Sequence, residues 1–196
     1  MRDPALFRPP FVSEVDEPVY DDCVVCSTLM LVSAWTLGKV TDSPTGPVMT
    51  RPQLKVLREQ MRDHLGARKQ VGGLTPADAA LMVHREWPWL PPLLTTPHRW
   101  DALWHSLQNG SAAAIWGNPS DVRKPTSPLR RWTEDDDFGH CLLVLRAKDD
   151  KGWVMDPLGS GSYKGQWVPE VQLRRFAFMD ADRVRSCAVV RNGSQS

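Results

Sequence analysis

The sequence predicts an α+β fold in a single domain that spans residues 1–196. Segments with the apolar spacing of helices fill the chain up to Gly110, whereas short apolar runs with the character of strands follow it. Helices first and strands later are typical of α+β domains. A chain of 196 residues is also long enough to bury one sizeable core.

The N-terminal part of the chain is expected to form an arm followed by a helix. Residues 1–21 contain four prolines, which predict an extended arm packed over the surface. A helix should begin near Asp22, because Asp21 or Asp22 can cap it, and it should end near Gly38.

Three further helices are predicted before the strands. Their starts carry a capping threonine or a proline, and glycines or prolines follow their ends. They run from about Pro52 to Leu65, from about Thr75 to Trp87 and from about Thr96 to Gly110.

Five strands and one short helix are predicted after Gly110. The strands cover Ala112–Trp116, Cys141–Ala147, Gly152–Met155, Tyr163–Val168 and Val184–Val190, and the helix covers Pro169–Phe176. Residues 118–138 are polar and rich in proline, so we expect an exposed loop near the candidate site.

The second and third of these strands are predicted to form an antiparallel hairpin around a short polar loop. If Lys148 pairs with Gly152, Asp156 lies opposite Val144 of the earlier strand. Asp156 then faces the same side of the sheet as His140, and a register shift of one residue would move it to the other face. The two polar side chains would still lie several positions apart, so strand coiling or a bulge must bring them together.

Cys23 lies at the start of the first predicted helix, and this position has chemical consequences. The free N–H groups and the dipole of a helix start favour a thiolate over a thiol, and they can hold a developing oxyanion. His140 begins an apolar strand, and Asp156 ends the next one. A thiol, an imidazole and a carboxylate are the parts of a cysteine nucleophile, its base and the group that orients the base.

These segments resemble the papain-like cysteine peptidases, in particular the double-glycine-leader peptidases and the related domains of actinobacterial phage lysins and cell-wall hydrolases. The similar segments are Asp22–Met30, Gly139-His140 before an apolar strand, and Asp156-Pro157. Tyr163–Val168, followed by a short helix, is also similar, and the resemblance covers about residues 20–176. It implies a papain-like fold whose helical half packs its N-terminal central helix on an antiparallel sheet.

The resemblance also implies roles for three residues and a class of reaction. Cys23 would be the nucleophile, His140 its base and Asp156 the orienting residue, with no cofactor and no metal. The protein would be a cysteine peptidase or amidase that hydrolyses peptide or amide bonds in bacterial peptidoglycan, as a lysin-like or virion-associated hydrolase of a phage. It would be made in the bacterial cytoplasm, act at the cell wall or within the virion, and contact other virion proteins.

One feature of the family is missing. Its members often place a glutamine shortly before the cysteine to complete the oxyanion hole, but residues 1–22 contain neither Gln nor Asn. Tyr20 or Ser13 could donate instead, or backbone N–H groups alone could serve. Two other functions therefore stay open: a weak or inactive structural or adaptor protein of a phage particle, and a cysteine peptidase that processes a protein precursor.

The other cysteines offer alternatives to this site. Cys26 could be the nucleophile, although its place one turn deeper suits packing. Cys23 and Cys26 also form a C-x-x-C pair, but such redox pairs usually follow a strand, and here a proline-rich arm precedes them. Zinc could bind Cys23, Cys26, His140 and Cys141, but neighbouring strand residues point to opposite faces, which disfavours this set.

The charge and composition of the chain argue against several classes of binding partner and location. The formal net charge of +1 gives no electrostatic case for nucleic acid or an anionic membrane surface. No apolar run approaches the length of a membrane span, and the N-terminal residues lack the apolar stretch of a secretory signal. Four cysteines are too few for a disulfide scaffold, so we expect reduced thiols.

Overall fold

The computed structural model describes residues 23–40, 76–88, 93, 98–118, 139–157, 165–177, 179–180, 183–184 and 187–190. The predicted arm over residues 1–21, the predicted helix from Pro52 to Leu65 and most of the predicted loop over 118–138 lie outside this part of the chain.

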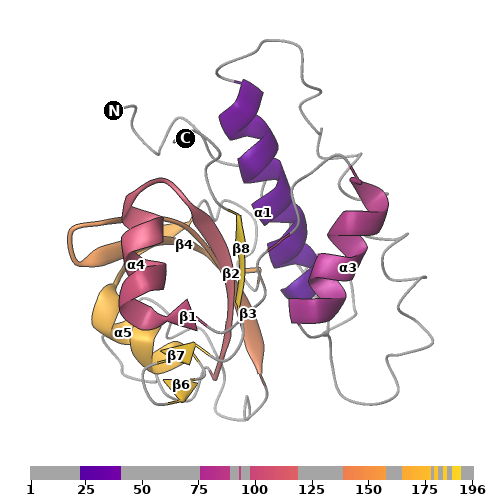
Figure 1. The fold of residues 1–196 in the computed structure, drawn as a ribbon. Helices are drawn as coiled ribbons and strands as arrows, with labels where there is room; N and C mark the ends of the chain where they lie inside the picture. The colour runs from indigo at the N-terminus through magenta and orange to yellow at the C-terminus, as the bar shows by residue number, and fades with distance from the viewer. Residues whose placement is uncertain are drawn as a thin grey trace.

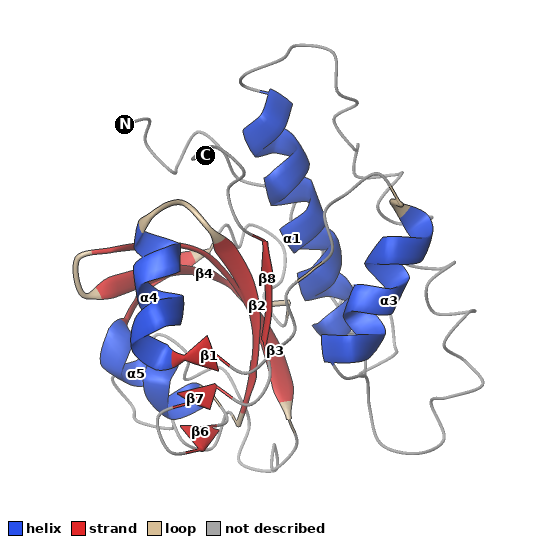
Figure 2. Cartoon of the chain, in the orientation of Figure 1, coloured by secondary structure: helices blue, strands red, loops and turns tan. Residues whose placement is uncertain are grey.

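The described helices occur close to their predicted positions (Figure 2). They are α1 (Cys23–Val40), α3 (Pro76–Glu86), α4 (Trp100–Gln108) and α5 (Glu170–Phe176). The start predicted for α4 is wrong by a few residues, because His98 and Arg99 form the short strand β1 instead. Gly110 follows α4 with a φ of 90°, a left-handed conformation that suits glycine and lets the chain turn away from the helix.

A five-stranded antiparallel sheet forms the centre of the molecule, in the order β5-β4-β3-β2-β8. Its strands are β2 (Ala112–Gly117), β3 (His140–Lys148), β4 (Lys151–Met155), β5 (Gln166–Pro169) and β8 (Cys187–Val190). The central strands β2 and β3 are rich in Ala, Ile, Leu and Val, and most of their residues are buried, as expected for strands covered on both faces.

The strand predicted over Val184–Val190 is wrong as one element. Its first residue belongs to β7 (Arg183–Val184), which pairs with β1 (His98–Arg99) and β6 (Met179–Asp180) in a separate three-stranded sheet. Its last residues form β8 at the edge of the main sheet. An apolar run shows that a segment is buried, but it does not show which sheet the segment joins.

Helices cover both faces of the main sheet (Figure 1). The α1 and α3 helices pack on one face, where their side chains form a core cluster with Trp116, Cys141 and Leu143. The α4 and α5 helices pack on the other face, against alternate residues of the same strands such as Ile115 and Leu142. The period of two along each strand therefore divides the core into two layers.

The first half of α1 is buried on all sides. Residues 24–32 are each at most 4% exposed, including the polar Ser27 and Thr28. Full burial of a Leu, Val or Met side chain stabilises a fold by about 1.5–3 kcal/mol, so this helix is fixed firmly between the sheet and α3. Within the described ranges, no helix combines the length and the apolar character that crossing a bilayer requires.

The β3–β4 hairpin departs from the predicted register. Lys148 pairs with Lys151 and not with Gly152, so the loop is one residue shorter than expected. Asp149 in this tight turn has a φ of 53°, a conformation that aspartate tolerates better than most residues. A register shift between Val144 and Arg146 then inserts an extra residue in β3, which is a β-bulge.

Candidate active site

Cys23 is the first residue of α1, and its side chain is half-buried against the core cluster below the helix. The first N–H groups of a helix have no partner inside the helix, and they carry its positive end. The thiol therefore lies beside donors that can stabilise negative charge, and it is less buried than Cys26 and Cys141.

His140 is the first residue of β3, where it pairs with Gly117 at the end of β2. Its side chain is only 1% exposed. The apolar residues that follow it are fully buried between the two helical layers and fix the strand that carries the ring.

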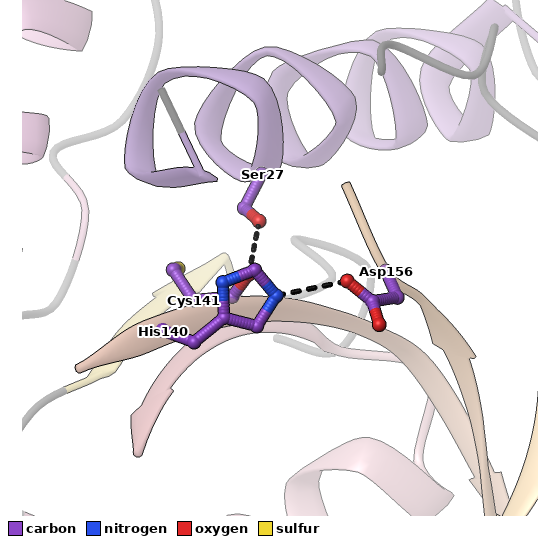
Figure 3. A network of polar contacts seen from close by, with 4 residues as sticks. All are labelled: Ser27, His140, Cys141 and Asp156. Atoms are coloured by element: carbon purple, nitrogen blue, oxygen red, sulfur yellow. Dashed lines mark hydrogen bonds and ion pairs between the residues drawn. The ribbon is translucent and has the colours of Figure 1, made fainter. Parts of the chain in front are cut away.

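Asp156 follows the last residue of β4 and is also buried. Its Oδ1 atom lies 2.8 Å from Nε2 of His140, and Figure 3 shows the carboxylate pointing directly at the ring. This contact leaves Nδ1 as the ring nitrogen available to a third group. The structure thus places two of the predicted site residues in direct contact.

The surroundings of His140 decide its charge. Burial alone lowers the pKa of the imidazole, because it penalises the charged ring. The attraction of the Asp156 carboxylate, its hydrogen bond, and a hydrogen bond and attraction from Cys23 outweigh this effect, so the pKa of His140 is raised well above its ordinary value of 6.5. Asp156 and Cys23 therefore both favour the charged form of the ring.

The structure brings Cys23 and Asp156 to the His140 ring, whereas Cys26 and Cys141 lie in the core cluster. Cys26 is fully buried in the core cluster beneath α1, and Tyr20 lies outside the described residues. Cys141 is also fully buried in that cluster.

Among the described residues, no group of three or more His, Cys, Asp or Glu side chains is arranged to hold a metal ion. Cys23, Cys26 and Cys141 are all free thiols.

Sequence reasoning missed one polar residue of the site. The hydroxyl of Ser27 donates a hydrogen bond of 3.0 Å to the carbonyl of Cys141, and both groups are buried. A serine within an otherwise apolar helix, four residues after Cys23, was the available signal, since buried polar groups almost always have a specific partner.

Comparison with solved structures gives a match over almost the whole chain. No family model matches the chain, and no curated protein does. A crystal structure from Bacillus anthracis, provisionally described as a C39-like peptidase, matches with a TM-score of 0.52 over 95% of this chain and 96% of that chain. The chain has the C39-like peptidase fold.

This match confirms the predicted fold class, an α+β papain-like fold in which an N-terminal helix packs on an antiparallel sheet. The sequence identity of 13% is low, so the likeness to the C39-like peptidase concerns the fold. The chemistry has to be argued from the side chains of this chain.

Proposed function

We propose that this protein is a cysteine peptidase or amidase, with Cys23 as nucleophile, His140 as general base and acid, and Asp156 as the residue that orients the imidazole. One observation carries the proposal: a buried imidazole has a carboxylate on Nε2 and Cys23 as its second partner. The C39-like fold supports the same kind of function.

The geometry suits acyl transfer. The Cys23 sulfur attacks the carbonyl carbon of an amide, and the N–H groups at the start of α1 hold the oxyanion that forms. His140 gives its proton to the leaving amine as the C–N bond breaks, which leaves a thioester on Cys23. The neutral ring then takes a proton from water, the hydroxide attacks the thioester, and the C–S bond breaks to release a carboxylic acid and the Cys23 thiolate beside the protonated ring. Asp156 keeps Nε2 occupied throughout, so that Nδ1 stays directed at the sulfur.

Cys23 is the better nucleophile of the two candidates in α1. Cys26 is fully buried among apolar side chains, where a substrate carbonyl could not reach it and a thiolate would be costly. Cys23 is half-buried and contacts His140. For the second oxyanion donor we keep Tyr20 as the proposed side chain, since no Gln or Asn precedes Cys23.

For the substrate we propose peptide or amide bonds of bacterial peptidoglycan, cut by a phage lysin-like or virion-associated enzyme that can contact other virion proteins. The similarity of the segments Asp22–Met30, Gly139-His140 and Asp156-Pro157 to phage cell-wall hydrolases supports this choice. The site of action would then be the cell wall or the virion.

The test compares purified peptidoglycan with an unfolded protein substrate, using the whole chain and Cys23→Ala as control. We expect new amino groups to appear in the peptidoglycan digest with the unsubstituted protein and not with C23A. Cleavage of the protein substrate alone would favour the processing of a precursor. If neither substrate is cleaved and Cys23 reacts with iodoacetamide no faster than a thiol in an unfolded peptide, the protein is an inactive structural or adaptor protein.

A further inference from the structure

A buried hydrogen bond joins the helix of the candidate nucleophile to the strand of the candidate base. Ser27 Oγ, on α1, donates to the carbonyl oxygen of Cys141, on β3, over 3.0 Å. Ser27 and Cys141 are both fully buried. In Figure 3 the serine side chain points from the helix down to the sheet.

The two ends of this bond lie next to the reacting groups. Ser27 is four residues after Cys23, so both residues lie on the same side of α1, one turn apart. Cys141 directly follows His140, so its carbonyl belongs to the backbone that carries the ring. The sulfur and the imidazole come from elements far apart in sequence, and apolar packing alone does not direct one group at the other with sub-ångström accuracy.

We propose that Ser27 is a positioning residue that sets the distance and direction between the Cys23 sulfur and the His140 ring by hydrogen bonding to the Cys141 carbonyl. This inference rests on the proposed function. Loss of the hydroxyl would leave a buried carbonyl without this donor, and the helix and strand would shift to relieve it. Displacements of about 1 Å at a reacting pair can reduce rates by about 100-fold.

The same helix supplies a matched control. Thr28 is the next residue and is also fully buried, but its hydroxyl has no hydrogen-bond partner in the described part of the chain. Thr28→Val removes a buried hydroxyl from α1 without breaking a hydrogen bond, whereas Ser27→Ala removes the one that reaches β3. A difference in Cys23 reactivity between the two variants therefore reports on the hydrogen bond from Ser27 to Cys141, and not on the loss of a polar group from the helix.

The test measures the rate at which iodoacetamide alkylates Cys23, identified by mass spectrometry, from about pH 5 to pH 9. A cysteine sulfur directed at a histidine ring reacts faster with alkylating agents than one without such a partner. We expect S27A to react about tenfold more slowly than the unsubstituted protein near neutral pH. T28V should keep the original rate and profile, and Ser27→Thr, which retains a hydroxyl, should recover most of the rate. Should S27A not fold, Ser27→Cys fills the same space with a weaker donor and should give a smaller shift in the same direction.

The same alkylation rates distinguish a failure of this proposal from a failure of the proposed function. If the unsubstituted protein reacts fast, His140→Ala reacts slowly and S27A matches the unsubstituted protein, Ser27 has no positioning role although the reactive thiol exists. If the unsubstituted protein reacts as slowly as H140A, Cys23 is not activated, and both proposals fall.

Discussion

Nε2 of His140 and Oδ1 of Asp156 lie 2.8 Å apart, although the two residues are sixteen positions apart in sequence. A bulge in β3 sets the register of the hairpin at this contact. Without it, the pairing of Arg146 with Trp153 would continue and would set Asp156 opposite Leu143. The observed pairing of Leu143 with Met155 instead carries Asp156 to the level of Leu142, two residues from His140.

Removal of the Asp156 charge should impair hydrolysis more than it impairs folding. Asp156→Asn keeps the size of the side chain and an acceptor oxygen, but it removes the attraction that contributes most to raising the pKa of His140 against the effect of burial. The pKa of the ring should then fall, and hydrolysis by Cys23 should drop by about 10²–10⁴-fold near neutral pH. Steady-state kinetics against pH, together with chemical unfolding, measures both effects.

The control for this prediction is Asp101→Asn, which changes an exposed carboxylate in the first turn of α4. It should leave both rate and profile unchanged. Equal kinetics for D156N and the unsubstituted protein would mean that Asp156 does not support the base.

Stability should depend on pH through His140. The pKa of this ring is higher in the folded protein than its ordinary value of 6.5, so the folded state holds the extra proton between these two values. The stabilising contribution is therefore fully present below about pH 6.5 and is lost as pH rises through the folded pKa. Urea unfolding of the unsubstituted protein and of His140→Gln at several pH values isolates the contribution, because other groups cancel in the difference. The difference in unfolding free energy should shrink as pH increases; a constant difference would rule out a raised pKa.

The two cysteines of α1 should behave differently. Cys23→Ala should abolish hydrolysis and leave stability nearly unchanged, since its side chain is half-buried. Cys26→Ala removes a fully buried side chain from the core, so it should lower the free energy of unfolding by on the order of 1–2 kcal/mol and leave hydrolysis close to normal. Activity assays and urea unfolding of both variants check this. Activity that survives in C23A and disappears in C26A would assign the nucleophile to Cys26.

Local signals in the sequence predict most of the fold, and they fail where distant contacts decide. A threonine followed by a proline predicted the start of α3 to within one residue, because proline suits the first position of a helix whatever its surroundings are. The hairpin was predicted with the correct strands and the wrong register. The loop is one residue shorter than predicted, and the bulge adds one residue to β3. Together these two changes leave Asp156 on the face of the sheet on which it was predicted. The partner of Ser27 lies 114 residues away, so no local pattern could reveal it.

Gly117 allows a test of whether the geometry around His140 depends on the packing of α5 against the end of β2. A Cβ atom at this position would lie 1.9 Å from the backbone carbonyl oxygen of Phe176, at the end of α5. Gly117 also pairs with His140, and the N–H of Asn118 donates to the same Phe176 carbonyl. Gly117→Ala must therefore move the end of β2 or the end of α5, at a cost of about 1–3 kcal/mol in stability, and the movement should reach His140 through the strand pair.

The matched variant is Gly152→Ala, at another buried glycine of the same sheet. There the nearest atom to a new Cβ is the flexible end of the Leu173 side chain, which can move away at lower cost than a backbone carbonyl can. We expect G117A to lose both stability and at least about tenfold in Cys23 alkylation rate, because small displacements of reacting groups have large kinetic effects. G152A should lose less stability and keep its alkylation rate. If both variants keep the original rate, the geometry around His140 does not depend on the contact between β2 and α5, and packing under α1 alone maintains it.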